Sequence, residues 1–167
     1  MSSEPRKIER PKGEAAFNLK LPPYSIEAEQ AVLGSIMLRP DAYAEINDIV
    51  DIEHFYSDKH KTIYKGISEL LGKGNPVDYL SLKNTLDEMG ALEQIGGAHY
   101  LAELVQVVPS ASNIEYYARI LEKKYMMRKL IYASEKVASM SYAETGDLEE
   151  ILDQAEKEIF VVTQKKT

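Results

Sequence analysis

The stretch "GISELLGKGNP", residues 66–76, comes closest to a nucleotide-binding motif. A phosphate-binding loop needs two glycines separated by four residues, then Lys and a Ser or Thr whose hydroxyl binds magnesium. Here five residues separate Gly66 from Gly72, and Gly74 follows Lys73 where the hydroxyl should stand. Apolar residues at helical spacing precede the second glycine. The stretch therefore predicts the C-terminal end of a helix and not a phosphate loop.

The other titratable side chains are too scattered to indicate an active site. None of the histidines, His54, His60 and His99, stands at the spacing of a known metal-ligand motif. Three carboxylates fall within residues 48–53, where a pair could exchange protons, but a solvated loop also accounts for them. We expect the histidines to be surface or packing residues. We expect no catalytic residue, metal site or bound cofactor in this chain.

The segment "KKYMMRK", residues 123–129, concentrates basic side chains around three apolar ones. Because residues four apart share one face of a helix, Lys124 and Arg128 would lie together. Such a face could bind an acidic protein partner or nucleic acid, or it could be a solvated face balanced by Glu122 and Glu135. The candidate partner-contact residues are Lys123, Lys124, Met127 and Arg128.

The overall charge distribution argues against nucleic acid as the partner of the central part of the chain. The formal net charge is −7, and residues 21–111 carry fourteen acidic but only six basic side chains. An acidic surface repels a phosphate backbone. The absence of cysteine excludes disulfides and thiolate chemistry and suits a reducing cytoplasm. With no apolar signal sequence or run of about 18 apolar residues, we expect a cytoplasmic protein that does not span a membrane.

The elements that must position these residues are predicted to be helices, which makes the fold all-α. Residues 1–20 are polar and are expected to form a disordered tail. Residues 21–111 are expected to form a small globular bundle of about five short helices, the globular head. Ser25 would cap its first helix, and a second helix would cover residues 41–50. Further expected boundaries are the caps Ser57 and Ser81 and the stops Gly90 and Pro109.

Residues 112–167 are predicted to form a long antiparallel helical hairpin that serves in oligomerisation and leads to a linker. A capping box at residues 112–115 would start a helix of about 30 residues, and "ETGD" would end it. Asp147 would then cap a last helix with a one-sided apolar stripe. Because two helices cannot bury both of their stripes alone, we expect an interface with another chain or with the head. The candidate oligomer-interface residues are Leu121, Tyr125, Leu130, Leu148, Leu152 and Ile159.

Several segments together resemble the N-terminal domain of bacterial replicative DNA helicases, the DnaB family. They are "SIEAEQAVLGS", the pair Phe55-Tyr56 followed by His60, "IGGAHYLAEL" and "VPSASNIEYYARI". Each segment alone is weak, but their order and spacing are specific, and the similarity covers about residues 21–163. The sequence departs from the family pattern at Tyr24, a place that is often polar, and in the length of its N-terminal tail.

The resemblance implies a role in a ring-shaped assembly. In the family, six such domains form a collar of three dimers whose hairpins pair between subunits, and the collar docks the C-terminal part of primase. ATP and magnesium would belong to a separate C-terminal RecA-like motor domain, before which this sequence stops. The chain is therefore expected to be a fragment of a longer helicase and not itself an enzyme.

Two functions follow from these observations. In the first, the chain is a non-catalytic collar domain that mediates ring assembly, as a dimer or as a hexamer made of three dimers, and recruits primase in DNA replication. DNA would then be contacted only through the full-length ring. In the second, the chain is a nucleic-acid-binding module that guides DNA at the collar through the basic hairpin face. Salt-dependent binding of single strands would distinguish the second function from the first.

Overall fold

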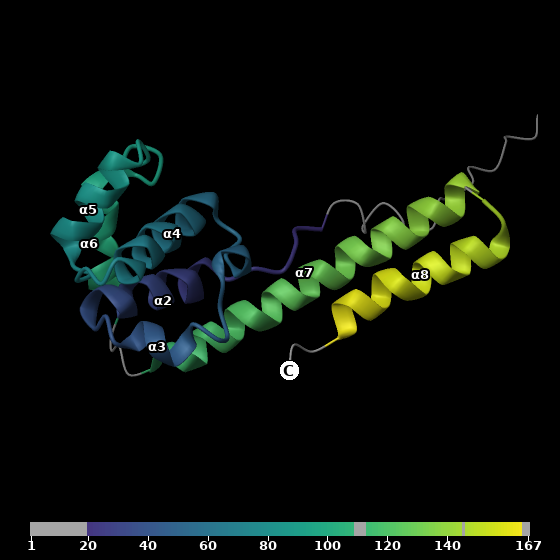
Figure 1. The fold of residues 1–167 in the computed structure, drawn as a ribbon, viewed down its shortest axis with the longest axis horizontal. Helices are drawn as coiled ribbons and strands as arrows, with labels where there is room; N and C mark the ends of the chain where they lie inside the picture. Colours follow the sequence, from purple (N-terminus) through teal and green to yellow (C-terminus); the bar gives the residue numbers. More distant parts are fainter. Residues whose placement is uncertain (1–19, 109–112, 145, 165–167) are drawn as a thin grey trace, which may run out of the picture.

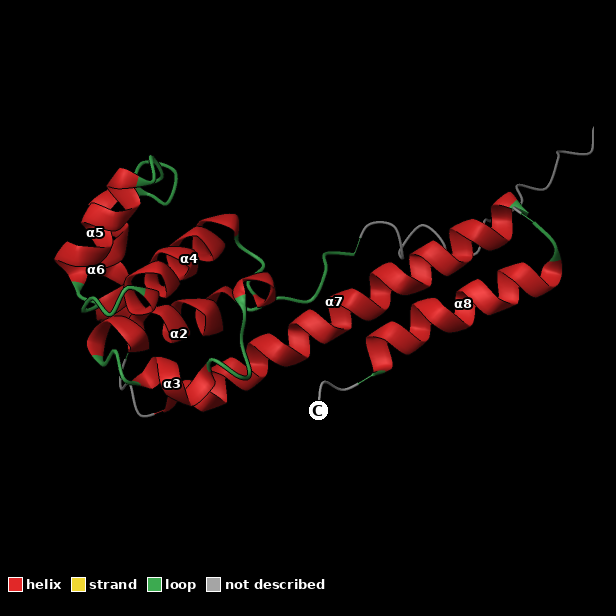
Figure 2. Cartoon of the chain, in the orientation of Figure 1, coloured by secondary structure: helices red, strands yellow, loops and turns green. Residues whose placement is uncertain are grey.

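The structure, a computed structural model, describes residues 20–108, 113–144 and 146–164, and every regular element in these ranges is a helix. Figures 1 and 2 show a globular head from which one long helix projects, with a second helix folded back along it. This arrangement confirms the predicted all-α bundle with a long antiparallel hairpin. The expectations for residues 1–19 and for the cap at Ser112 lie outside the described residues.

The head contains α2 (Ile26–Leu38), α3 (Ala42–Ile46), the 3-10 helix η1 (Ile52–His54), α4 (Asp58–Gly72), α5 (Tyr79–Glu88) and α6 (Gly97–Val107). The hairpin consists of α7 (Ile114–Ala143) and α8 (Leu148–Thr163).

Helix α2 is the centre of the head and contacts α3, α4, α6 and α7. Its predicted cap is confirmed, because the Ser25 hydroxyl accepts the N–H of Ala28 at 3.2 Å. Gly34 allows α2 to approach α6 closely. A Cβ at position 34 would lie 2.3 Å from the carbonyl oxygen of Leu104, which is backbone and cannot move aside easily. The helix is therefore buried on nearly all sides and does not show the single apolar stripe of a surface helix.

The "GISELLGKGNP" stretch is the end of α4, as predicted. The helix ends at Gly72, and Gly74 has a left-handed φ of 70°. The N–H of Asn75 donates to the carbonyl of Leu70 at 2.9 Å, which closes the helix end in the usual glycine-terminated manner. Gly66 lies inside α4 and faces α5. The backbone here has none of the strand-to-helix geometry of a phosphate loop.

Two predicted boundaries in the head are wrong. The second helix is shorter than 41–50, because α3 ends at Ile46 and a turn follows. Helix α5 is capped by Asp78 and not by Ser81: the Asp78 carboxylate accepts the N–H of Ser81 at 2.8 Å, and the Ser81 hydroxyl accepts the N–H of Asp78 at 2.9 Å. The hydrogen bonds from Ser81 lower the pKa of Asp78. Ser81 is therefore the third residue of the helix and not its cap. Its hydroxyl completes the reciprocal pair of hydrogen bonds that starts α5.

Helix α7 belongs to both parts of the molecule. Its first turns lie in the core of the head, where Ile114, Ala118 and Leu121 are buried. The head therefore extends past the expected boundary at residue 111. The helix ends where predicted, with Glu144 in a left-handed conformation at φ 50°. Asp147 caps α8 by accepting the N–H of Glu150 at 2.9 Å, as predicted.

Candidate interaction surfaces

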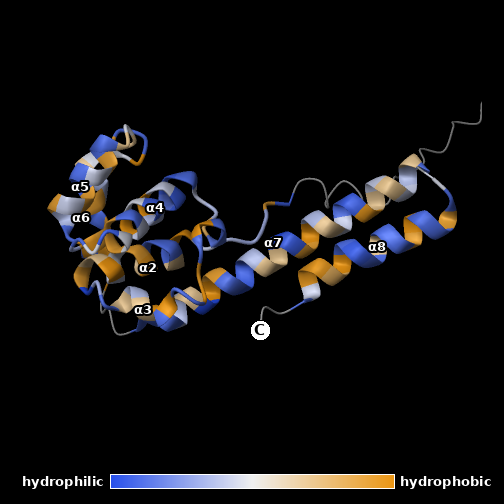
Figure 3. Cartoon of the chain, in the orientation of Figure 1, coloured by the Kyte–Doolittle hydropathy of each residue, from blue (hydrophilic) through white to orange (hydrophobic). Residues whose placement is uncertain are grey.

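The hairpin leaves large apolar side chains in solvent. Leu148 and Leu152 on α8 are 70% and 58% exposed, and Leu130 on α7 is 45% exposed. Figure 3 shows apolar residues along both α7 and α8 beyond the head. Ile159 is half-buried, while Val162, near the end of α8, is buried. The hairpin seam thus uses only part of the apolar stripe, and the remainder is available to another surface.

Two candidate interface residues take part in the fold of the chain itself. Leu121 is only 2% exposed and lies in the head core, because α7 starts inside the head, so we remove it from the candidate interface. Tyr125 is partly buried where the hairpin leaves the head. Its hydroxyl donates to Glu53 at 3.1 Å, and its ring lies 4.4 Å from that of His54. Burial and the Glu53 carboxylate raise the pKa of Tyr125.

Arg128 is buried, which corrects its assignment to an exposed basic patch. Its guanidinium donates to the carbonyl of Pro23 at 2.8 Å and to the carbonyl of His54 at 3.0 Å. It also lies 5.5 Å from the ring of Tyr56 and 5.8 Å from that of Tyr125. Because a guanidinium offers several donors in one plane, it can join two backbone segments at once. Arg128 thus ties α7 to the start of the head.

The basic cluster that remains exposed is smaller than the sequence suggested. Lys123 is exposed, Lys124 is half-buried, and Met127 is 41% exposed. Lys129 is half-buried with its ammonium 5.5 Å from the ring of Tyr125. These side chains, and not Arg128, form the charged surface at the base of the hairpin.

His54 is held in its neutral form where α7 leaves the head. Burial lowers its pKa, and the Asp51 carboxylate opposes the change only in part. The N–H of Asp51 donates to the Nδ1 atom of His54 at 3.0 Å, which requires that nitrogen to carry no proton. The imidazole thus accepts from the backbone at one edge while its ring packs against that of Tyr125.

A groove of about 440 Å³ lies where the head meets the hairpin. Sequence reasoning missed it, because its two walls are about 70 residues apart in the chain and only the fold brings them together. Its aromatic and cationic lining can hold an apolar side chain flanked by acidic groups. The lining residues are Glu53, Phe55, Tyr56, Lys61, Tyr125, Arg128, Lys129 and Tyr132.

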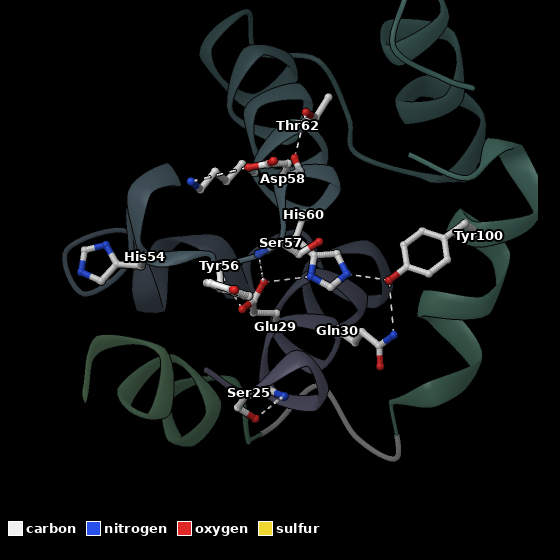
Figure 4. Close-up of polar contacts among 12 residues, drawn as sticks. Ser25, Glu29, Gln30, His54, Tyr56, Ser57, Asp58, His60, Thr62 and Tyr100 are labelled. Atoms are coloured by element: carbon white, nitrogen blue, oxygen red, sulfur yellow. Dashed lines mark hydrogen bonds and ion pairs between the residues drawn. The ribbon is translucent and has the colours of Figure 1, made fainter. Parts of the chain in front are cut away.

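A second feature missed from the sequence is a buried polar network in the head, shown in Figure 4. The Glu29 carboxylate lies 2.9 Å from the Nδ1 atom of His60, and the other ring nitrogen lies 2.5 Å from the hydroxyl of Tyr100. Gln30 donates to the same hydroxyl at 3.3 Å. Glu29 and His60 are almost completely buried, so the network is closed to a substrate. His60 is therefore a packing residue, as interpreted from the sequence.

Ser57 does not cap α4 with its side chain as expected, and Glu29 instead anchors the two residues that lead into the helix. The side chain of Ser57 makes no capping hydrogen bond. Instead the carboxylate of Glu29 accepts the N–H groups of Tyr56 and Ser57, at 3.1 and 3.2 Å. A side chain of α2 thus stabilises the positive end of α4, which locks these two helices together.

Neither a metal centre nor a membrane helix occurs in the part of the chain that the structure describes. Its histidines and carboxylates form no group of three or more that could hold a metal ion. None of its helices combines the length and the apolar character needed to cross a bilayer.

A globular head with a projecting hairpin whose apolar side chains stay exposed is typical of an assembly or docking domain. Comparison with known proteins identifies the family to which this domain belongs. The sequence model of the family described as "DnaB-like helicase N terminal domain" matches residues 21–123, and the chain belongs to this family.

The curated relatives are replicative DNA helicases. The chain is 40% identical over 150 residues to the replicative DNA helicase DnaB of Geobacillus stearothermophilus, covering 90% of this chain and 33% of that protein. It is also 40% identical over 150 residues to the replicative DNA helicase DnaC of Bacillus subtilis, with the same coverage. The chain therefore spans about a third of the length of these relatives.

Solved structures place the similarity in the N-terminal domain. The crystal structure of the N-terminal domain of DnaB helicase from Mycobacterium tuberculosis superposes with a TM-score of 0.80 at 38% identity, covering 84% of this chain and 99% of that one. A DnaB-like replicative helicase, described together with its interactions with primase, superposes with a TM-score of 0.70 at 28% identity. That match covers 86% of this chain and 32% of the helicase. The resemblance seen in the sequence is confirmed.

Proposed function

We propose that this chain is the non-catalytic collar domain of a replicative DNA helicase, which assembles the ring and recruits primase. One observation carries the proposal: in a chain of this family, the apolar stripe of the hairpin stays in solvent at Leu148, Leu152 and Leu130. Exposed apolar side chains on a helical pair are stabilised when another helical surface covers them. Hairpins of two copies would give a dimer, and three dimers would give the hexameric collar.

The proposed second partner is the C-terminal domain of primase. The support is that a structural neighbour of this chain is a helicase described with its interactions with primase. On this chain the contact would use Lys123, Lys124 and Met127, which form an accessible basic and apolar surface at the base of the hairpin. Arg128 is left out, because its guanidinium is already held by two carbonyl groups.

The remaining parts of the proposal concern the whole protein. The relatives that the chain matches are helicases about three times its length. ATP hydrolysis with magnesium and the contact with DNA would belong to a motor domain and to the complete ring, in the cytoplasm.

The experiment is light scattering coupled to size exclusion, with the chain alone and mixed with the cognate C-terminal domain of primase. We expect a dimer or hexamer whose mass increases with primase. A Lys123→Glu, Lys124→Glu double variant should keep the self-association and lose the primase complex. Lys65→Glu, an exposed change on α4, is the matched control and should lose neither. An unchanged primase complex in the double variant would refute the assigned contact.

The second candidate function is binding of single-stranded nucleic acid, and the groove is the observation that favours it. Tyr56 and Tyr125 with Lys129 combine aromatic rings with a positive charge, as single-strand binding sites do. The acidic head opposes it. A labelled oligonucleotide that binds at low salt and dissociates as salt rises would support this function, whereas no binding at low salt would exclude it.

A further inference from the structure

The first described residues of the chain run directly past the groove where the head meets the hairpin. The carbonyl of Pro23 accepts a hydrogen bond from Arg128 at 2.8 Å, and the ring of Tyr24 stacks on that of Tyr56 at 4.5 Å. Arg128 and Tyr56 both line the groove. In Figure 1 this segment, coloured purple, extends away from the head in the direction that α7 takes. The sequence that precedes Lys20 is therefore joined to the fold at the rim of the groove.

The lining of the groove determines what it can hold. It combines three tyrosine rings with two lysine side chains, which are Tyr56, Tyr125, Tyr132, Lys61 and Lys129. The carboxylate in the lining is already engaged, because Glu53 accepts the hydroxyl of Tyr125 at 3.1 Å. Lys61 has only a long ion pair of 3.8 Å with the exposed Asp58, so it can turn to a new partner. An aromatic side chain close to a carboxylate would satisfy both parts of this lining.

The sequence just before the described chain has this composition. Residues 13–19, "GEAAFNL", contain Phe17, which is the only aromatic residue before Lys20. They also contain one acidic side chain, Glu14, and no basic one. Residues 6–12, in contrast, contain four basic side chains and one acidic side chain, which the lysines of the groove would repel. The charge of the groove therefore selects residues 13–19 over the rest of the N-terminal tail.

The connection between Phe17 and the fold suits a contact within one molecule. Phe17 stands six residues before Pro23, and an extended chain spans up to about 20 Å over six residues. This reach exceeds the dimensions of a groove of about 440 Å³ at whose rim the chain is held. A short tether also gives an effective concentration in the millimolar range, so that a weak contact is formed in most molecules. A second copy or a free partner lacks this advantage.

We infer that the N-terminal segment, residues 13–19, docks in the groove of its own chain, with Phe17 against the tyrosine rings and Glu14 facing the lysines. The inference goes beyond the proposed function and does not rest on it. The groove borders residues 123–127, because Tyr125 is part of its lining. A partner that needs both surfaces must therefore displace the segment first.

Acetylation of lysines, followed by mass spectrometry, tests the inference on the whole chain. Lys61 and Lys129 should react slowly in the wild type and roughly three- to tenfold faster in a Phe17→Ala variant, which loses the tethered contact. Lys65 and Lys123 are exposed and lie outside the groove lining. They should react at the same rate in both proteins, which also verifies that the fold is unchanged.

Two controls show whether the protection is specific and intramolecular. Ile8→Ala removes an apolar side chain from the same tail and should leave the acetylation rates of all four lysines unchanged. A peptide of residues 13–20, added at millimolar concentration to the Phe17→Ala chain, should restore the protection, and the same peptide with Phe17→Ala should not. Protection in the wild type should not depend on protein concentration, because the segment and the groove belong to one molecule.

The outcomes also separate this inference from the proposed function. Equal acetylation of the groove lysines in the wild type and in Phe17→Ala would overturn the inference, as would an equal gain in Ile8→Ala. Protection that appears only as the protein concentration rises would assign the groove to a second copy. Protection that appears only with a single-stranded oligonucleotide would assign it to nucleic acid, and either result would refute docking of the segment. The collar function is tested independently by the mass in solution, so the two failures are distinguishable.

Discussion

The head and the hairpin use their apolar side chains in opposite ways. In the head, Leu33, Ile67 and Leu101 are fully buried in one core that also receives the first turns of α7. In the hairpin, Leu148 and Leu152 remain mostly in solvent, and their stripe is covered only where α8 meets α7. The head therefore has the packing of an independently stable unit. The hairpin has the packing of half an interface, which a second surface would complete.

The two regions also differ in their polar interactions. The head encloses Glu29 and His60 in a network where each group has a partner. The hairpin carries surface ion pairs such as Lys136 with Glu158, in which the hydrogen bond from the lysine lowers the pKa of the carboxyl. Closed networks fix one packing, whereas exposed charges steer encounters between molecules. The head has exposed ion pairs as well, such as Arg39 with Glu45, so what distinguishes it is the closed network that fixes its packing.

The largest effect should come from comparing leucines in the two regions. Leu33→Ala removes a fully buried side chain and should lower the free energy of unfolding by about 2–5 kcal/mol. Leu152→Ala removes a mostly exposed one and should cost less than about 0.5 kcal/mol at protein concentrations where the chain is monomeric. Urea unfolding measures both. Equal costs for the two variants would erase the distinction between a buried head and an uncovered hairpin.

Arg128 links the hairpin to the head, and its substitution tests how much that link stabilises the fold. Arg128→Ala leaves the carbonyls of Pro23 and His54 without their donors and should destabilise the fold by about 3 kcal/mol. Lys129→Ala, one residue further, should cost less than about 0.5 kcal/mol because it removes no such bond. If the neighbouring variant proved as harmful as Arg128→Ala, the assigned role of the guanidinium would be wrong. Thermal unfolding of both variants makes the comparison.

The buried network in the head predicts a smaller but specific effect. Glu29→Gln weakens the acceptor for the N–H groups of Tyr56 and Ser57 and should cost about 1–3 kcal/mol. Ser57→Ala should be nearly neutral, because the serine side chain makes no capping bond. Hydrogen exchange at the amides of Tyr56 and Ser57 should increase in the first variant only. An increase in the Ser57 variant would return the capping role to the serine.

The smallest effect should be a pH dependence from His54. Its pKa is lowered in the folded protein by burial, so the unfolded chain binds the proton first as the pH falls. Stability from the neutral imidazole is complete above the unfolded pKa of about 6.5 and is lost as the pH falls from there through the lower folded value. His54→Asn, whose amide can still accept the Asp51 N–H, should remove this part of the pH dependence. The exposed His99→Asn is the control, and urea unfolding across this range tests both.

Much of this architecture follows from local sequence, and the rest does not. The caps at Ser25 and Asp147 and the glycine end of α4 depend on side chains within a few residues, so local patterns predict them. The hydrogen bonds from Tyr56 and Ser57 to Glu29 could not be foreseen, because Glu29 is 27 residues away from Tyr56 and its position in the sequence indicates only a first-turn acid of α2. The burial of Arg128 could not be predicted for the same reason. In the sequence Arg128 stands beside lysines, and the groups that hold its guanidinium, the carbonyls of Pro23 and His54, are distant in the chain.

The central claim is that the uncovered hairpin stripe associates with another copy. Sedimentation equilibrium of the wild type and of a Leu148→Asp, Leu152→Asp double variant tests it most directly, with circular dichroism to verify that the helices persist. Because both positions are exposed, the substitutions should leave the fold intact. We predict that the wild type sediments as a dimer or larger and that the double variant is a folded monomer. A wild type that is monomeric at every concentration, or a folded variant with unchanged association, would contradict the account.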